Sequence, residues 1–433
     1  MKQKSKPAFP PASLAWGCLA IFSAITARAA DLKFDFGSEK PLPNFTKVTP
    51  DTVYDAQRHY GFIPNDSPVP NNVQIFAADV EEGNYTVTLR FGNPKTATST
   101  TVKAESRRLM VENVTTEPGK YETRTFTVNV RRPKFGNDSV KINGREEGPP
   151  LAVNWDDSLS LEFSGKQPGV ISAEIAPAKE VTTVFLAGDS TVTDQRYEPF
   201  AGWGQMLPRF FQPTIAISNH AESGLALKSF ERQKRLAKIL SMMKKGDYLF
   251  IQFGHNDQKD KSEGAGPFTT YKENLKTFIS GARGKGGIPI LFTPMERLRW
   301  DGGSPKQTLA DYAEAVRQVG DEEKVPVIDL NAMSLKLYGA LGEKNSTKAF
   351  VFYPAKTFPG QEKPMADRTH HNAFGGYELA RCVVEGIKAK VPELAKHLTK
   401  DAGTFNPETP DDPEKIDIPR SRIKDRTEKP AGS

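Results

Sequence analysis

One serine of this sequence stands where a nucleophile is expected. The apolar run 184–187 has the character of a buried strand and ends at Gly188, after which Asp189 and Ser190 follow at the tip of a turn. A serine hydroxyl attacks a carbonyl carbon when a nearby base removes its proton, and histidine is the usual base near neutral pH. Ser190 therefore predicts acyl-transfer chemistry if a histidine reaches it.

The candidates for that base are His59, His220, His255, His370, His371 and His397. Of these, only His370 has an acid at a useful local spacing, because Asp367 lies three residues before it in a loop that leads into a predicted helix. A carboxylate folded back onto the imidazole fixes its tautomer and stabilises the imidazolium that forms during proton transfer. Ser190, Asp367 and His370 are thus a candidate catalytic set.

Each part of this set also has a purely structural interpretation. Gly188-Asp189-Ser190 alone fits a turn with a helix-capping side chain, and Asp367 with His370 fits a pair of metal ligands. The turn is not a phosphate-binding loop, because no Gly-Lys-Ser/Thr follows it. The catalytic interpretation is favoured because all the parts fall, in order, at one predicted edge of a sheet.

The negative charge that develops on the attacked carbonyl oxygen needs hydrogen-bond donors that are already in place. Three donors are expected at the same edge: the backbone N–H groups of Ser190 and Gly224, and the side-chain amide of Asn256. One such donor contributes about 3 kcal/mol to transition-state stabilisation. A reaction of this kind requires neither a metal ion nor a cofactor.

The segment that must position these residues spans 179–398, where apolar runs alternate with helical periodicity. Such alternation predicts a three-layer α/β/α domain with a parallel sheet, whose ligands bind at the carboxyl ends of the strands. Ser190, Gly224 and Asn256 each follow a predicted strand. The predicted strands are 181–186, 214–218, 248–253, 288–293 and 325–330, and the predicted helices are 203–211, 230–245, 271–282, 308–319 and 376–390.

Residues 30–178 have a different pattern. Short stretches such as 85–91 and 123–130 alternate apolar and polar residues between turns, which predicts an all-β sandwich domain ahead of the α/β domain. Its aromatic residues Tyr54, Tyr60, Phe62 and Trp155 fit either the core or a platform on which sugars stack. Residues 399–433 are rich in proline and charged residues and are expected to be a loosely ordered polar tail.

Residues 1–29 read as a signal peptide: three lysines precede a short apolar stretch, and Ala27-Arg28-Ala29 fits a cleavage site. We therefore expect export to the periplasm or the medium; a lipid anchor on Cys18 is the weaker alternative. Removing the four basic residues of this segment from the formal charge of +6 leaves +2, so the high pI gives little support to nucleic-acid binding. No segment predicts a membrane span. Without Cys18, Cys382 stands alone and is expected to be a buried core thiol.

These residues resemble the sequence blocks of the SGNH, or GDSL-type, hydrolases over roughly 181–395. Gly188-Asp189-Ser190 resembles the first block, Gly224 lies in the second, and Gly254-His255-Asn256-Asp257 is similar to the third. Asp367-Arg-Thr-His370 resembles the last block. The resemblance implies that Ser190 is the nucleophile, that Asp367 and His370 are its acid and base, and that Ser190, Gly224 and Asn256 form the oxyanion hole.

Within that superfamily, the chain most resembles bacterial rhamnogalacturonan acetylesterases. The resemblance rests on Phe253–Asp257, Gly202-Trp-Gly-Gln205 and Thr369–Asn372 followed by Gly375–Ala380. The first half resembles the galactose-binding-like module that precedes such enzymes, on Phe34–Gly37, 48–54 and 60–62. One departure is that Gly224 is followed by Leu225 and Ala226, where many members carry Arg and Ser.

The resemblance implies hydrolysis of an acetyl ester on a plant cell-wall polysaccharide. On this interpretation the partner is an acetylated acidic polysaccharide, and Arg297, Arg299 and His371 are expected at its binding surface. The alternatives are an acetylesterase for another glycan such as xylan, a lipase or thioesterase on the same scaffold, and a carbohydrate-binding protein without activity. The sequence predicts neither the ligand of the sandwich nor the oligomeric state.

Overall fold

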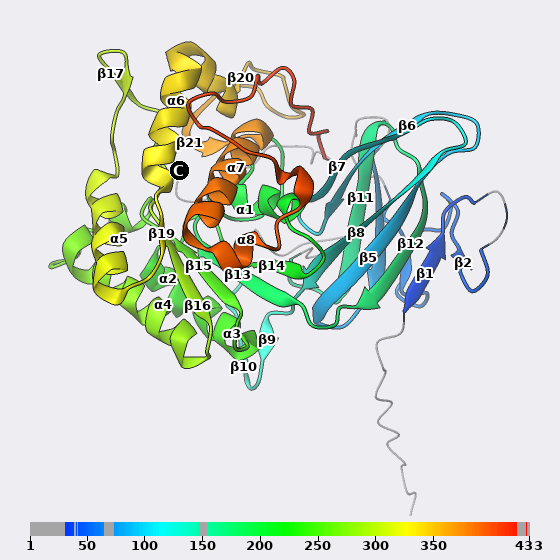
Figure 1. Ribbon diagram of the computed structural model, residues 1–433, viewed down its shortest axis with the longest axis horizontal. Helices are drawn as coiled ribbons and strands as arrows, with labels where there is room; N and C mark the ends of the chain where they lie inside the picture. Colours follow the sequence, from blue (N-terminus) through cyan, green and yellow to red (C-terminus); the bar gives the residue numbers. More distant parts are fainter. Residues whose placement is uncertain are drawn as a thin grey trace, which may run out of the picture.

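Alternation of apolar and polar residues folds the first half of the chain into two five-stranded sheets that face each other (Figure 1). The computed structural model describes residues 31–421 apart from 39, 41, 65–72, 145 and 147–153, together with Pro430, so the predicted signal peptide lies outside the described residues. One sheet has the order β2 (Thr46–Lys47), β1 (Leu32–Asp35), β12 (Val170–Pro177), β5 (Gly83–Gly92) and β8 (Tyr121–Val130). The other has the order β3 (Tyr60–Phe62), β4 (Gln74–Asp79), β11 (Ser158–Gln167), β6 (Thr98–Ala104) and β7 (Arg108–Thr116).

The core of this sandwich comes from the inward-facing residues of both sheets. Val87 and Leu89 of β5 and Leu161 of β11 are fully buried in it, and Phe34 packs edge-on against Phe76 with ring centroids 4.8 Å apart. Apart from the parallel β1–β2 pair, the strands of the two large sheets are antiparallel. A small hairpin of β9 (Lys134–Phe135) and β10 (Asp138–Ser139) follows.

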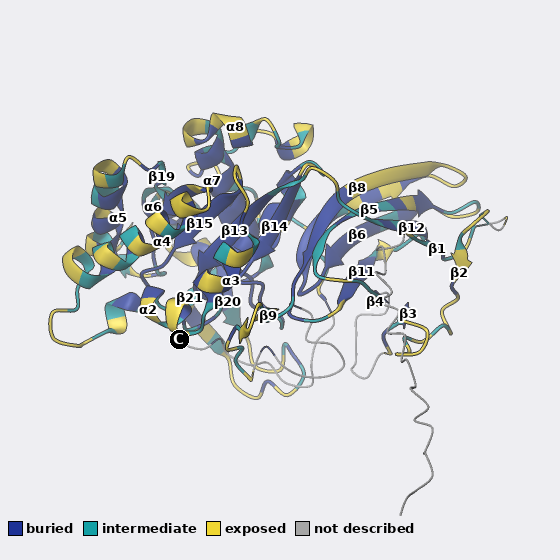
Figure 2. Cartoon of the chain, turned by 90° about the horizontal axis from the view of Figure 1, so that it is seen from below, coloured by how far each residue is buried: buried dark blue, intermediate teal, exposed yellow. Residues whose placement is uncertain are grey.

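The second half forms a parallel five-stranded sheet between two layers of helices, which confirms the predicted α/β/α class. Its order is β14 (Ile215–Asn219), β13 (Thr182–Gly188), β15 (Tyr248–Gln252), β16 (Ile288–Phe292) and β19 (Val327–Ile328). Successive residues of one strand enter different cores, because side chains alternate across a sheet: Val184 and Leu186 face one layer, Phe185 and Ala187 the other. Figure 2 shows these strands in dark blue between the helices.

The helices on the Val184 side are α1 (Trp203–Met206), α6 (Leu330–Ser346), α7 (Ala373–Lys390) and α8 (Pro392–Ala395). Those on the Phe185 side are α2 (Leu227–Arg232), α3 (Arg235–Met242), α4 (Lys272–Gly284) and α5 (Ala310–Glu323). Two small antiparallel pairs complete the domain: β17 (Trp300–Asp301) with β18 (Ser304–Pro305), and β20 (Phe350–Tyr353) with β21 (Met365–His371). Cys382 is a buried thiol of α7, as expected.

The boundaries of the predicted elements shift by a few residues, and at two of them the backbone gives the reason. The helix predicted over 230–245 is two helices, α2 and α3, because Lys234 between them adopts a left-handed backbone with φ of 63°. The strand predicted over 325–330 shortens to β19, because Asp329 caps α6 by accepting a hydrogen bond from the Ala332 N–H at 3.2 Å. That capping stops the strand and starts a helix that the sequence pattern did not reveal.

The sandwich and the α/β domain share an interface built from strands β7 and β8 (Figure 1). Leu109 of β7 is fully buried in the core of the α/β domain. Arg108 forms an ion pair with Asp194 at 2.6 Å, and Arg209 forms one with Glu112 at 2.8 Å. The two domains are therefore joined by apolar packing, by the buried Arg108–Asp194 pair and by the half-buried Arg209–Glu112 pair.

The prediction of a loosely ordered tail is wrong for residues 399–421. Arg381 of α7 forms an ion pair with Asp411 and stacks over the Phe405 ring at 4.4 Å from its centroid. The tail then reaches the domain interface, where the Ser421 hydroxyl donates to Glu162 at 2.8 Å and Ser421 is almost completely buried. Composition alone predicted disorder because these contacts are made by single residues far apart in the sequence.

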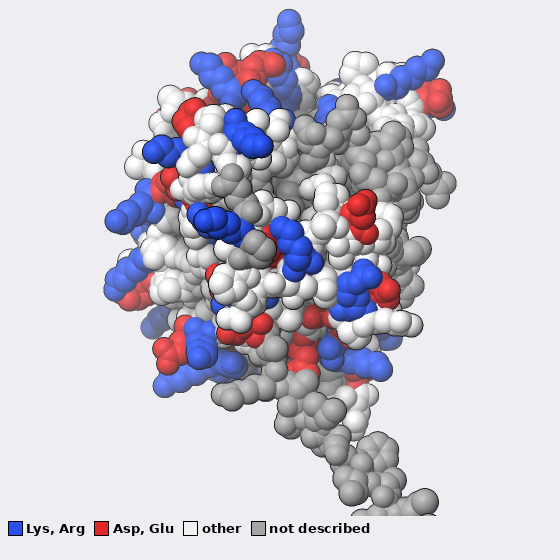
Figure 3. All heavy atoms as spheres, turned by 90° about the vertical axis from the view of Figure 1, so that its right-hand side faces the viewer, with Lys and Arg blue, Asp and Glu red and all other residues white. Residues whose placement is uncertain are grey.

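Among the described residues, helix length and side-chain polarity leave no candidate for a bilayer-crossing helix. Figure 3 shows one face of the molecule, on which basic and acidic side chains are intermingled. A mixed surface of this kind does not form the single-sign field that attracts a polyanion on that face.

Candidate active site

The three residues of the predicted catalytic set come together in one hydrogen-bonded chain. Ser190 Oγ lies 2.8 Å from His370 Nε2, and His370 Nδ1 lies 2.9 Å from Asp367 Oδ2. All three residues are buried, with exposed fractions of 3% for Ser190, 2% for His370 and 8% for Asp367. A hydroxyl, an imidazole and a carboxylate in this order form the arrangement that activates serine for attack on a carbonyl carbon.

A local irregularity of β21 brings Asp367 and His370 to the same side. In a regular strand, residues three apart point to opposite faces. The register of β21 against β20 shifts, however, so that His371 pairs with Phe350 and Asp367 with the next residue, Val351. The three residues between them are looped out, and Asp367 Oδ1 accepts the backbone N–H of His370 at 3.0 Å. The bulge thus closes the acid onto the base.

The turn that carries Ser190 is held by a chain of buried hydrogen bonds. Trp203 Nε1 donates to Gln252 Oε1 at 2.6 Å, Gln252 Nε2 donates to Thr191 Oγ1 at 2.9 Å, and Thr191 Oγ1 donates to Asp189 Oδ1 at 2.7 Å. Each of these residues is buried, so each polar group depends on its protein partner. The chain fixes the end of β13 against β15 and thereby fixes the serine.

Asp189 is an anion beneath this turn. Its Oδ2 lies 3.3 Å from His255 Nδ1, and its other oxygen accepts both the N–H and the hydroxyl of Thr191. Burial opposes the ionisation of Asp189, but His255 and the Thr191 donors outweigh burial and lower the pKa of this carboxyl. The acid of the predicted first block, Asp189, therefore stabilises the turn and pairs with His255 instead of His370.

The loops that carry the predicted oxyanion donors are tied to the same edge. Glu222 N donates to Gly188 O at 3.2 Å, which joins the loop after β14 to the end of β13. Asn256 Nδ2 donates to Leu225 O at 3.1 Å, which joins the loop after β15 to the residue that follows Gly224. Gly224 has φ of 82°, a left-handed conformation that favours glycine. Ser190, Gly224 and Asn256 therefore lie on three connected loops.

The carboxylate of Asp367 is strongly stabilised in its ionised form. Burial opposes ionisation, but the hydrogen bond and charge of His370, with the backbone N–H groups of Thr369 and His370, lower its pKa to about 2. Asp367 is therefore negative at any pH at which a histidine acts as a base, and it can hold the imidazole in one tautomer.

A second buried serine–histidine pair lies in the same domain but lacks an acid. Ser218 Oγ is 2.9 Å from His220 Nε2, whereas His220 Nδ1 has no hydrogen-bond partner among the described residues. Burial, followed by the charges of Arg131, Lys238 and Arg235, holds the pKa of His220 well below its usual value. His220 is thus a neutral core residue. His59 pairs with Asp79 in the sandwich, and His397 pairs with Thr214.

Comparison with known proteins agrees with this geometry. Residues 186–362 match the model of the GDSL-like Lipase/Acylhydrolase family. Rhamnogalacturonan acetylesterase RhgT of Bacillus subtilis (strain 168) is 39% identical over 228 residues, which are 52% of this chain and 97% of that relative. The chain belongs to the GDSL family. It is an esterase of that family by the same comparison, and its matched region is the α/β domain.

Two further relatives of this GDSL hydrolase come from the same organism. "Probable rhamnogalacturonan acetylesterase YesY" is 36% identical over 223 residues, covering 50% of this chain and 98% of its own length. "Uncharacterized esterase YxiM" is 26% identical over 377 residues, covering 82% of this chain and 90% of its own length. The second match extends over more of the chain than the α/β domain alone.

The two arginines expected at the substrate surface of this GDSL hydrolase differ in their surroundings. Arg297 is half-buried, and its guanidinium donates to Gln258 Oε1 at 3.0 Å and to His255 O at 3.2 Å. Burial lowers the pKa of Arg297, and the charge of Asp189 acts in the opposite direction. Arg299 is exposed. Arg297 is therefore anchored beside the third-block loop, and Arg299 projects from the protein surface.

The prediction that His371 contacts substrate is wrong. His371 follows His370 in β21, but its Nε2 lies 2.8 Å from the Tyr338 hydroxyl and its ring centroid is 4.2 Å from that of Phe350. It is 1% exposed. Burial, followed by the nearby His370 and His255, lowers the pKa of His371 to about 3. His371 is a neutral core residue.

This lowered pKa predicts a dependence of stability on pH. The unfolded chain takes up a proton on His371 below about pH 6.5, and the folded chain does so only near pH 3, so the free energy of unfolding falls as the pH falls through this window. Between pH 7 and pH 5, His371 should account for roughly 2 kcal/mol of that fall. Urea unfolding of the wild type and of His371→Phe at both pH values measures it. Identical pH dependence of the two proteins would contradict the assignment.

The aromatic residues of the sandwich belong largely to packed positions. Trp155 is 4% exposed, its Nε1 donates to Glu146 at 2.7 Å, and the Arg131 guanidinium stacks on its ring at 4.6 Å from the centroid. These contacts rule out Trp155 as a sugar-stacking platform. Tyr60 packs against the sandwich core. The Tyr54 hydroxyl donates to Asp79 at 2.8 Å, and burial, followed by that hydrogen bond, raises the pKa of Tyr54 to about 12.

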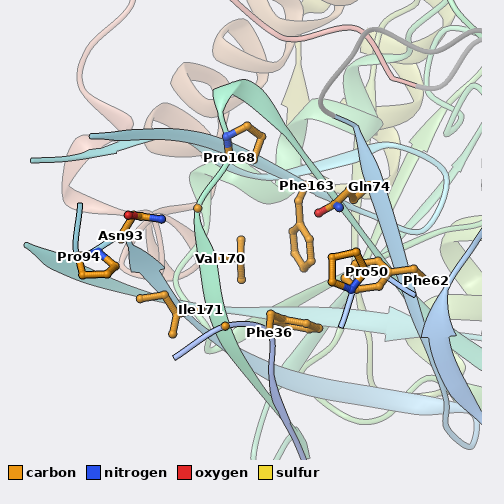
Figure 4. A pocket seen from close by; sticks show the side chains of 13 residues that line it. Phe36, Pro50, Phe62, Gln74, Asn93, Pro94, Phe163, Pro168, Val170 and Ile171 are labelled. Atoms are coloured by element: carbon orange, nitrogen blue, oxygen red, sulfur yellow. The ribbon is translucent and has the colours of Figure 1, made fainter. Parts of the chain in front are cut away.

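A separate cavity of about 200 Å³ lies within the sandwich (Figure 4). Among the described residues, those that line it all belong to the sandwich and carry no titratable side chain. Its lining includes Phe36, Pro50, Phe62, Gln74, Asn93 and Phe163. Among the described residues, no group of three histidines, cysteines or carboxylates is arranged to hold a metal ion.

Proposed function

We propose that this GDSL hydrolase is an exported carbohydrate esterase that removes acetyl groups from rhamnogalacturonan through Ser190, His370 and Asp367. One observation carries the catalytic part: the hydroxyl, the imidazole and the carboxylate are linked by contacts of 2.8 and 2.9 Å in a buried site. The names of the relatives support the acetyl ester and the polysaccharide.

In the first half of the reaction, Ser190 Oγ attacks the acetyl carbonyl carbon while His370 Nε2 removes the hydroxyl proton. The carbonyl oxygen becomes negative and is stabilised by the N–H groups of Ser190 and Gly224 and by the Asn256 amide. His370 then donates its proton to the departing sugar oxygen. The C–O bond to the sugar breaks, and an acetyl-Ser190 ester remains.

In the second half, water replaces the sugar. His370 removes a proton from the water molecule, the resulting hydroxide attacks the acetyl carbon, and the bond to Ser190 Oγ breaks with return of the proton to that oxygen. Asp367 remains ionised throughout, because its pKa of about 2 is far below that of an imidazolium, and it stabilises the positive ring in both halves. Acetate and free enzyme result.

The acidic sugar of rhamnogalacturonan gives Arg297 a role in substrate binding. Its guanidinium has five N–H donors, and the contacts to Gln258 and to the His255 carbonyl hold it at the edge of the third-block loop. Arginine is suited to planar recognition of a carboxylate. We propose that Arg297, assisted by the exposed Arg299, contacts a galacturonate carboxylate beside the acetylated sugar.

The residue pattern of positions 1–29 supports export, since it has a basic start, a short apolar stretch and a small-residue cleavage pattern. A polysaccharide of the plant cell wall is found outside the cell, so export is consistent with the proposed substrate. Amino-terminal sequencing of the protein collected from the periplasm or the medium tests it, and a start near Ala30 is the expected result.

The substrate is tested by acetate release from matched acetylated polymers. The purified protein should release acetate faster from native pectic rhamnogalacturonan than from acetylated xylan, and Ser190→Ala should release no detectable acetate from either. Arg297→Met should lose rate on rhamnogalacturonan and keep wild-type rate on a small aryl acetate, since that ester has no carboxylate. Faster release from xylan, or equal losses by Arg297→Met on both esters, would contradict the substrate proposal.

A further inference from the structure

A hairpin tip of the sandwich is buried in the domain interface. Residues Glu105–Arg107 connect β6 to β7, a position that is normally exposed to solvent. Here Ser106 is 2% exposed and Arg107 6%, and both Glu105 and Arg107 have positive φ angles, of 55° and 62°. Glu105 N donates to Ser160 O at 3.0 Å, and Glu105 Oε1 accepts the Ser160 N–H at 3.0 Å. The tip is thus anchored to the sandwich and points its arginine at the other domain.

Arg107 contacts one segment of the α/β domain through two hydrogen bonds and one ion pair. Its Nη1 donates to Gln195 O at 3.0 Å and to Phe200 O at 2.9 Å, and its Nη2 lies 2.7 Å from Glu198 Oε1. These partners belong to residues 194–201, which we name the clamp loop. A single guanidinium therefore joins both ends and the middle of the clamp loop.

The clamp loop contacts the nucleophile and the base directly. Gln195 Nε2 donates to Ser190 O at 2.7 Å, and the Phe200 ring meets the His370 ring edge-on with centroids 5.9 Å apart. Ala201 N donates to His371 O at 2.9 Å, which pairs the loop with the strand that carries His370. A change in the position of the loop would therefore move both Ser190 and His370, the two partners of the hydrogen bond.

Nearby contacts stabilise the Arg107 arrangement from both domains. Gln205 Nε2 donates to Ser106 O at 2.6 Å and to Gln195 O at 2.9 Å, so it bridges the hairpin tip and the clamp loop. Glu198 is 5% exposed, and it also accepts the Ser421 N–H at 3.0 Å. A buried carboxylate that loses its cationic partner becomes costly to hold in place, so the loop depends on Arg107 for its conformation.

We propose that Arg107, which the sandwich supplies, is a positioning residue for hydrolysis: it fixes the clamp loop and through it the distance between Ser190 and His370. The inference rests on the proposed roles of Ser190 and His370. It assigns the sandwich a part in the chemistry itself, in addition to any ligand that the sandwich binds.

The full chain carrying Arg107→Met tests this with an ester that needs no polysaccharide contact. On phenyl acetate, kcat should fall roughly 10- to 100-fold with KM changed less than about twofold, because displacement of a catalytic group by about 1 Å costs about that factor. The rate at which a serine-directed phosphonate labels Ser190 should fall by the same factor. Circular dichroism and thermal unfolding establish that the variant is folded.

Glu112→Gln is the matched control. It removes another ion pair of the same interface, with Arg209, but Glu112 has no hydrogen bond to the clamp loop. Wild-type kcat and labelling rate in Glu112→Gln, with losses in Arg107→Met, support the inference. Wild-type values in folded Arg107→Met, or equal losses in both variants, overturn it.

If Arg107→Met does not fold, Arg107→Lys is the variant that tests the positioning role of Arg107. Lysine keeps the charge opposite Glu198 but cannot span the two carbonyls with a planar fork. A kcat at least about threefold below wild type, with unchanged KM, supports the inference, and wild-type kcat overturns it. Labelling of Ser190→Ala at the wild-type rate would instead contradict the proposed nucleophile, so the failure of the proposed function is recognised separately.

Discussion

Ser190→Ala should lower kcat for acetate release by about a million-fold, to the rate supplied by binding and oxyanion stabilisation alone. The reason is geometric: Ser190 Oγ is the atom that His370 Nε2 contacts at 2.8 Å, and alanine has nothing in its place. The fold should be unaffected, because the change removes one oxygen atom. Acetate release from phenyl acetate measures the loss of kcat. Mass-spectrometric detection of phosphonate on the protein measures the loss of the reactive hydroxyl.

The matched control for this variant is Ser218→Ala. Ser218 also lies buried, and its hydroxyl is 2.9 Å from an imidazole, that of His220, but no carboxylate is bonded to the other ring nitrogen within the described chain. Ser218→Ala should therefore keep wild-type kcat and be labelled by the phosphonate at the wild-type rate. Activity that survives in Ser190→Ala and is lost in Ser218→Ala would show that Ser218, and not Ser190, is the nucleophile.

Asp367→Asn should lower kcat by about ten-thousand-fold with little change in KM. Asparagine has the size of aspartate, but it is neutral and its amide can present an N–H to His370 Nδ1, which favours the wrong tautomer of the ring. The substitution removes a full negative charge at neutral pH, since the pKa of Asp367 is about 2. Loss of kcat and of phosphonate labelling by similar factors is the expected signature.

Stability must be measured alongside that activity. A carboxyl whose pKa is lowered from 3.8 to about 2 stabilises the folded chain above its unfolded pKa, and this contribution is lost as the pH falls toward 2. At neutral pH, Asp367→Asn therefore forfeits up to about 2 kcal/mol of folding free energy. Asp329→Asn, which alters a carboxylate that caps α6 and pairs with Arg317, controls for a general effect of removing an acid. An Asp367→Asn protein with wild-type kcat would rule out the proposed role of the acid.

Much of the α/β domain could be predicted from the sequence, because its strands are buried on both faces. Continuous apolar runs located β13 and β15 to within two residues at each end. The polar residues after those runs identified the carboxyl edge, since parallel strands end together. Ser190, Asp367 and His370 were then the one combination of hydroxyl, acid and imidazole that had both a local acid–base spacing and a place at that edge.

The predictions that failed depend on backbone details that periodicity does not encode. The left-handed Lys234 divides one apparent helix into α2 and α3 while leaving the apolar pattern intact. The expectation that His371 contacts substrate fails because its side chain packs against Tyr338 and Phe350 in the core. Residues 367–370 are expected in a loop but belong to strand β21, whose sequence has no apolar strand pattern.

The contact between Arg107 and the clamp loop could not be predicted from the sequence. Arg107 and Glu198 are separated by about ninety positions and lie in different domains, so neither spacing nor composition indicates their contact. The same holds for Ser421, whose burial could not be inferred from a proline-rich polar tail. Sequence patterns describe an element and its faces, whereas contacts between domains are decided by the shapes of the folded surfaces.

The bulge in β21 sets different tolerances for length changes along the chain. Asp367 and His370 face each other because residues 368–370 are looped out of the ladder, so a single insertion or deletion between positions 367 and 370 would move the imidazole away from the carboxylate. Surface loops between the serine and this pair that carry no site residue are under no such restriction, since loop closure depends weakly on length. Natural variants should therefore differ in the size of these connecting loops and keep the three-residue spacing of Asp367 and His370.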